Sequence, residues 1–85
     1  MAEYKIFFKK SVWKDFQSIP DKDLKKILNH IESLSSNPRL PGSQKISGQE
    51  RYRLRQGQYR FIFSIQDEEL TVWVVKVGHR RENYR

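Results

Sequence analysis

The chain has 85 residues, and its 17 Lys and Arg against 10 Asp and Glu give a formal net charge of +7 at pH 7. This length holds one domain, residues 1–85, with one small core, and the charge favours a polyanionic partner. Cysteine is absent, which excludes disulfides, thiolate catalysis and thiolate zinc sites. The first ten residues have no signal-peptide pattern and no apolar run could span a bilayer, so we expect a cytoplasmic protein without a membrane partner.

The first part of the chain predicts one strand and a helical hairpin. Tyr4, Ile6 and Phe8 alternate with other residues, as in a β-strand. Ser11 is a candidate N-cap for a first helix, which Pro20 should end. A second, amphipathic helix follows. Its predicted core positions are Leu24, Ile27, Leu28, Ile31 and Leu34.

The remainder predicts a long loop over residues 35–49, rich in Pro and Gly, and then strands over 51–56, 59–65 and 70–77. We therefore predict an α+β fold with an N-terminal strand, a helical hairpin and a three-stranded antiparallel C-terminal sheet. Simple alternation in the last strand puts one apolar set on each face, which suits a central strand. The two sets are Leu70, Val72 and Val74, and Trp73, Val75 and Val77.

One face of the predicted hairpin is wholly cationic. Alternation places Arg51, Arg53 and Arg55 together, opposite Tyr52 and Leu54. A two-residue turn at 57–58 would add the arginine at position 60 to this face while keeping the aromatic residues of the next strand on the other. The glycine at position 57 fits such a turn, because type II′ requires a positive φ at its first central residue.

No carboxylate alternates with these arginines, and like charges directly across a strand pair each cost a few tenths to about 1 kcal/mol. We therefore expect the face to bind an anion. The planar guanidinium makes two parallel hydrogen bonds to phosphate and stays charged at any working pH. A phosphate-bearing partner is the interpretation that we favour over a merely solvated sheet face.

The C-terminal segment, residues 78–85, combines an imidazole, three guanidiniums and a phenol. With the features above, in this order and spacing, the sequence resembles the RelE/ParE superfamily of toxins from Tyr4 to Tyr84. The most specific matching parts are Tyr59-Arg60 at the start of a strand and Gly78-His79-Arg80 at the end of the last strand.

The resemblance implies a toxin that enters the ribosomal A site, cuts the messenger RNA there and is silenced by a partner antitoxin. Arg51 and Arg53 match positions that are lysines in the best-known member, and Arg60 matches its phosphate-stabilising arginine. Arg80 matches the arginine after the last strand, and Tyr84 matches the tail tyrosine. The chain departs from that member at position 79, where it has a histidine in place of a lysine, and in its shorter tail.

Cleavage of RNA without a metal needs a base for the 2′-OH, cations for the phosphorane and an acid for the leaving oxygen. Arg53 and Arg60 would stabilise the phosphorane, Tyr84 would orient or deprotonate the 2′-OH, and Arg80 or His79 would serve the leaving group. His79 is also the competing base. We expect further RNA contacts from Lys45, Arg51, Arg55 and Arg81.

We expect no cofactor and no metal, because the two histidines lie on different elements and no carboxylate cluster has metal-ligand spacing. Two alternatives remain open. The same fold hosts ParE-like toxins that inhibit gyrase, and the arginine face alone would suit a non-catalytic RNA-binding module. A cleavage site requires Arg60, Arg80 and either Tyr84 or His79 together, and the sequence contains all four.

Overall fold

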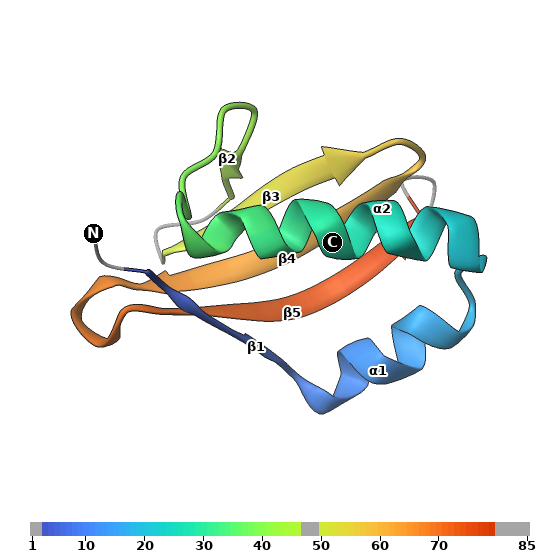
Figure 1. Ribbon diagram of the computed structural model, residues 1–85, viewed down its shortest axis with the longest axis horizontal. Helices are drawn as coiled ribbons and strands as arrows, with labels where there is room; N and C mark the ends of the chain where they lie inside the picture. The colour runs from blue at the N-terminus through green and yellow to red at the C-terminus, as the bar shows by residue number, and fades with distance from the viewer. Residues whose placement is uncertain (1–2, 47–49, 80–85) are drawn as a thin grey trace.

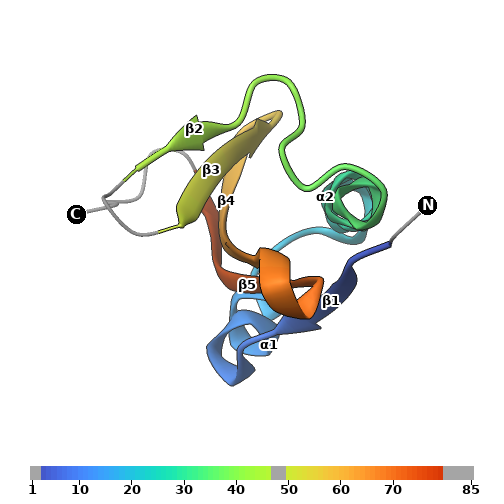
Figure 2. The same ribbon diagram turned by 90° about the vertical axis from the view of Figure 1, so that its left-hand side faces the viewer.

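One five-stranded sheet with both helices on one of its sides makes up the computed structural model, which describes residues 3–46 and 50–79 (Figures 1 and 2). The strand order is β1-β5-β4-β3-β2; β1 runs parallel to β5, and the other neighbours are antiparallel. The elements in chain order are β1 (Lys5–Phe8), α1 (Lys10–Gln17), α2 (Asp21–Glu32), η1 (Ser33–Ser35), β2 (Gln44–Lys45), β3 (Arg51–Gln56), β4 (Tyr59–Gln66), η2 (Asp67–Glu69) and β5 (Thr71–His79).

The predicted α+β class is confirmed, but the sheet is larger than the three strands expected. The N-terminal strand joins the sheet beside β5, with Phe8 opposite Val74. The predicted long loop also contains a short strand, β2, in which Gln44 lies opposite Arg53. The pairing of β1 with β5 joins segments distant in the chain, whereas β2 pairs with the strand that follows it. Within the described residues, no helix is long and apolar enough to cross a membrane.

The core lies between the two helices and the inner face of the sheet. Its buried side chains are Val12, Phe16, Ile19, Ile27, Ile31, Leu34, Leu54, Phe61, Phe63, Ile65, Val72, Val74 and Val77. Most of the predicted core positions of α2 are confirmed, but Leu28 is exposed. Fully burying a Val, Leu, Ile or Phe side chain contributes roughly 1.5–3 kcal/mol. The buried residues of this small core therefore account for much of the fold's stability.

The first helix begins earlier than predicted. Its N-cap is Lys9, and Ser11 lies inside the helix. The Lys9 amide donates to the carbonyl of Val74, and the Lys9 carbonyl accepts from the amide of Val12. Lys9 is therefore hydrogen-bonded to β5 through its amide and begins the helix through its carbonyl. Ser11 does not act as the N-cap.

The central strand β5 contains an irregularity that simple alternation could not predict. Ile62 of β4 lies opposite Lys76, whereas the next residue, Phe63, lies opposite Val74. Val75 is thus an extra residue on β5, as in a β-bulge. Beyond it the alternation is reversed, so Val77 is buried on the helix side with Val74. The predicted grouping of Val77 with Trp73 is wrong for this reason.

The predicted start of the last strand is also wrong, because Leu70 is an exposed residue with a positive φ of 52° that caps η2. Beside it, Asp67 joins three segments. Its carboxylate accepts hydrogen bonds from the Tyr4 hydroxyl at 2.7 Å and from Nη1 and Nη2 of Arg39 at 3.1 and 2.7 Å. The hydrogen bonds from Arg39, and then that from Tyr4, lower the pKa of Asp67 to about 2. This cluster anchors the loop after η1 to the end of β4.

Candidate nucleic-acid interface

The arginine hairpin forms in the predicted register. Arg55 lies opposite Arg60 and Gln56 opposite Tyr59, across the two-residue turn. Gly57 has a φ of 60°, as a type II′ turn requires at its first central position. Leu54, Phe61, Phe63 and Ile65 of the two strands are buried in the core. Arg51, Arg53, Arg55 and Arg60 therefore share the face that points away from the helices.

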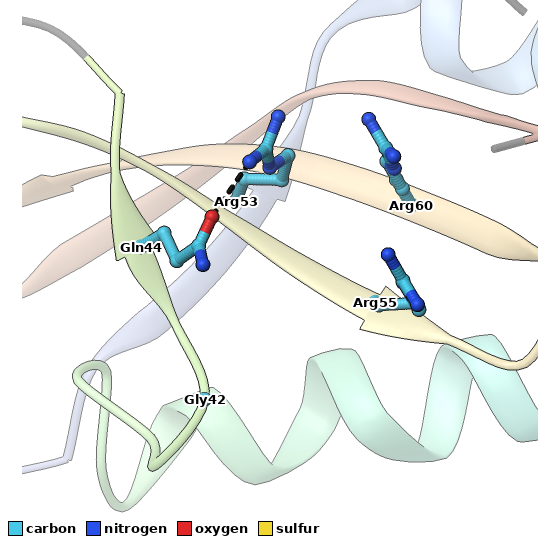
Figure 3. Close-up of a pocket in the computed structure, with 5 residues that line it drawn as sticks. All are labelled: Gly42, Gln44, Arg53, Arg55 and Arg60. Carbon is cyan, nitrogen blue, oxygen red and sulfur yellow. Dashed lines mark hydrogen bonds between the residues drawn. The ribbon is translucent and has the colours of Figure 1, made fainter.

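Three of these arginines line a hollow of about 210 Å³ on that face. Figure 3 shows Arg55 and Arg60 rising side by side from neighbouring strands, with Arg53 turned toward β2. The Nη2 of Arg53 donates to the Oε1 of Gln44 at 2.6 Å. Gly42, with a φ of 92°, completes the lining. The hollow thus presents several guanidiniums to one small volume, which suits a phosphate group.

Cations dominate this whole face of the sheet. In the part of the chain that the structure describes, none of the strand residues on it is acidic. The cationic residues on it are Lys5, Arg51, Arg53, Arg55, Arg60 and Lys76. Lys76 reaches it because it follows the bulge and lies opposite Ile62. A face with one sign of charge concentrates an anionic partner near it.

The other predicted RNA contacts in the described chain are placed differently. Arg51 is exposed on the cationic face, opposite Ser64 and outside the lining of the hollow. Lys45 is opposite Tyr52, so it points to the helix side of the sheet, where its Nζ lies 3.8 Å from the Oε2 of Glu50. The structure therefore brings Arg51 to the cationic face and leaves Lys45 on the other.

His79 is also on the helix side, because the bulge reverses the alternation before it. It lies opposite Tyr59, with the ring centroids 5.4 Å apart in an edge-to-face arrangement. Together with Ser18 and Ile19 these two rings border a separate hollow near the end of α1. Arg60 lies opposite Gly78 instead. The structure thus separates His79 from the lining of the arginine hollow, and its role in catalysis stays a prediction.

The remaining predicted site residues, Arg80, Arg81 and Tyr84, lie outside the described residues. Within residues 3–46 and 50–79, no group of three or more His, Cys, Asp or Glu side chains could hold a metal ion. Sequence reasoning missed Gln44 and Gly42, which reach the hollow because β2 pairs with β3. A two-residue strand has no pattern long enough to signal it.

Comparisons with known proteins identify the family of this chain. Residues 6–84 match the model of a family described as the ParE toxin of the type II toxin–antitoxin system parDE. Because the match spans nearly the entire chain, the chain belongs to this family of toxins. The predicted membership of the RelE/ParE superfamily is confirmed.

Several similar proteins carry the RelE name. A protein of Methanocaldococcus jannaschii named as toxin RelE1 is 27% identical over 98% of this chain and 97% of its own length. A chain of the toxin–antitoxin complex RelBE2 from Mycobacterium tuberculosis has a TM-score of 0.82 at 26% identity, covering 96% of this chain and 97% of that one. The isolated Escherichia coli RelE toxin has the same fold, with a TM-score of 0.82 at 17% identity over 94% of this chain and 87% of that one.

Proposed function

We propose that this toxin is a metal-independent endoribonuclease that cuts messenger RNA in the ribosomal A site and so blocks translation. The observation that carries the proposal is the hollow in which Arg53, Arg55 and Arg60 converge, on a face where none of the described strand residues is acidic. RNA presents a phosphate beside every internal 2′-OH, so a site for one phosphate can also be a site for its cleavage.

In the proposed reaction the 2′-oxygen attacks the adjacent phosphorus, and the bond from phosphorus to the 5′-oxygen breaks. The products are a 2′,3′-cyclic phosphate and a free 5′-OH. Arg53 and Arg60 would stabilise the negative charge of the phosphorane, the role in which preorganised donors contribute most. The hydrogen bond from Arg53 to Gln44 holds this guanidinium in place before RNA arrives.

The two proton transfers are assigned to the C-terminal segment. Tyr84 would orient the 2′-OH or accept its proton, and Arg80 would serve the leaving 5′-oxygen. A free tyrosine has a pKa of about 10, so it needs neighbouring cations to act as a base near neutral pH. We therefore expect slow turnover on naked RNA and faster turnover when the ribosome orients the message.

We also infer that a cognate antitoxin neutralises this chain. Toxin–antitoxin complexes are the subjects of several of the similar structures, including RelBE2 of Mycobacterium tuberculosis and the RelE–RelB complex of Pyrococcus horikoshii. The antitoxin would cover the cationic face with acidic and apolar residues or displace the C-terminal segment. A neutralising complex that left Arg51, Arg53 and Arg60 accessible and the C-terminal segment in place would contradict this inference.

Cleavage is tested with purified toxin, ribosomes programmed with a defined message, and mapping of the cut ends by primer extension. We expect cuts inside the A-site codon, retained in EDTA-treated toxin, with cyclic phosphate on the upstream product. Binding should weaken steeply with salt, by a log–log slope of about −0.7 per neutralised phosphate on single strands. Uncut message together with stalled DNA gyrase would replace this proposal with the ParE-like alternative, and salt-independent binding would remove the cationic face from it.

A further inference from the structure

The cationic face of the sheet also carries a pair of exposed aromatic rings. Phe7 of β1 lies opposite Trp73 of β5, and the two rings stack with centroids 5.0 Å apart and an interplanar angle of 27°. Phe7 is 40% exposed and Trp73 is 38% exposed. An aromatic surface is therefore accessible on the side of the sheet that the helices do not cover. A partner that buried these rings would gain binding free energy.

The register places this pair in line with an arginine. Trp73 lies opposite Ser64 of β4, and Ser64 lies opposite Arg51 of β3. Neighbouring strands are about 4.8 Å apart, so the backbone positions of Trp73 and Arg51 are separated by about 10 Å. Ser64, between them, has the smallest side chain of the row. The space above Ser64 is therefore flanked by an indole ring and a guanidinium.

The next row of the sheet leads from this space to the arginine hollow. It contains Lys76, Ile62 and Arg53, paired in register, and it lies about 7 Å further along the strands. Arg53 lines the hollow. A polyanionic strand that passes from the aromatic pair to the hollow thus meets cations along its path and no strand carboxylate among the described residues.

We propose that Phe7 and Trp73 form a stacking platform for the bases of the message next to the cut. One base lies over Ser64 against the indole of Trp73, and its phosphate contacts Arg51. The inference rests on the proposed function, because it extends the path of the same RNA strand. Single-strand binders generally combine a cationic groove with aromatic rings on which successive bases stack, and small domains of this kind hold several nucleotides.

The first test uses the fluorescence of Trp73. The chain has two tryptophans, so the variant Trp13→Phe leaves Trp73 as the sole indole. This variant is titrated with a ten-nucleotide RNA and with an abasic strand of equal length and charge. We expect quenching by the RNA only and about tenfold weaker binding of the abasic strand. Equal affinity for the two strands without quenching would overturn the platform.

The second test compares variants that leave the net charge unchanged. Trp73→Leu removes the indole, and Ser64→Ile fills the space beside it; each should weaken RNA binding about tenfold without changing the salt dependence. Trp13→Leu is the matched control, because Trp13 is 56% exposed but lies on α1. Thermal unfolding by circular dichroism checks that each variant is folded. Full affinity in both Trp73→Leu and Ser64→Ile would contradict the proposal.

A third arm separates this inference from the proposed nuclease and from a protein partner. If Arg60→Ala abolishes cleavage while Trp73→Leu binds message normally, the stacking platform is wrong and the nuclease stands. If the wild-type chain shows stacking but cuts nothing, the platform stands without the nuclease. If Trp73→Leu prevents only neutralisation by the antitoxin, the aromatic pair is a protein docking site and the proposal is overturned.

Discussion

Arg55 and Arg60 lie directly opposite each other on β3 and β4, and both side chains border the same hollow. Like charges in this arrangement destabilise a strand pair by a few tenths to about 1 kcal/mol. We predict that Arg55→Thr increases the free energy of unfolding by that amount, because threonine also suits a strand. The same variant should bind RNA more weakly. Urea denaturation and RNA titration measure the two effects, and a less stable variant would mean that Arg55 makes a net stabilising contact.

Removal of Arg60 should affect the reaction far more than the fold. Loss of one preorganised donor to the phosphorane typically costs about a hundredfold or more in rate. We therefore expect Arg60→Ala to cut programmed ribosomes at least about a hundredfold more slowly, by single-turnover primer extension. Lys25→Ala is the control, because it removes a cation from the exposed side of α2. Equal rates for the two variants would remove Arg60 from the active site.

His79→Ala should have little effect on cleavage, because the histidine packs against Tyr59 on the helix side of the sheet. We expect its cleavage rate to stay within a few-fold of the parent rate, and its melting temperature to fall as the edge-to-face contact is lost. Tyr59→Leu should lower the melting temperature in the same way. A loss of cleavage as large as that of Arg60→Ala would show that His79 reaches the reacting groups when RNA is bound.

The Asp67 cluster should give the fold an acid-sensitive component. The pKa of Asp67 is about 2 in the folded chain, below the value of about 3.9 for an unperturbed aspartate. The unfolded state therefore binds the proton first, and the stabilisation is present above pH 4 and lost as the pH falls toward 2. We predict that Asp67→Asn is less stable than the parent at pH 6 and that this difference shrinks toward pH 2. A difference that is constant with pH, in urea titrations, would contradict the assignment.

Local patterns in the sequence predicted the local parts of the structure. The β3 bounds, the Arg55–Arg60 pairing and the turn at Gly57 were all predictable, because alternation, hydrophobic register and turn chemistry agree there. The parallel pairing of β1 with β5 was not, because it joins segments distant in the chain, and the pairing of β2 with β3 was not, because a strand of two residues has no alternation to recognise. The sequence therefore did not predict Gln44 as a site residue, and only the structure shows that it lines the hollow.

The placement of His79 depended on a feature with no clear sequence signal. Strict alternation from Trp73 puts residues 75, 77 and 79 on the cationic face, whereas the extra residue in β5 puts Val77 and His79 on the helix side. Nothing in an apolar run of valines indicates where a bulge lies. The same shift brought Lys76 to the cationic face, where sequence reasoning had not placed it.

The extra residue at Val75 also limits how residue roles can be transferred among related toxins. Two homologues with identical letters after this point would present them to opposite sides if only one of them had the bulge. Deleting Val75 would remove the extra residue and leave Lys76 opposite Ile62 and Val77 opposite Phe61, whereas pairing Val75 regularly in a strand of the same length would exchange the faces of residues 76 and 77. Alignments of this strand must therefore be anchored on structure, because the same residues after position 75 lie on opposite faces of the sheet with and without the bulge.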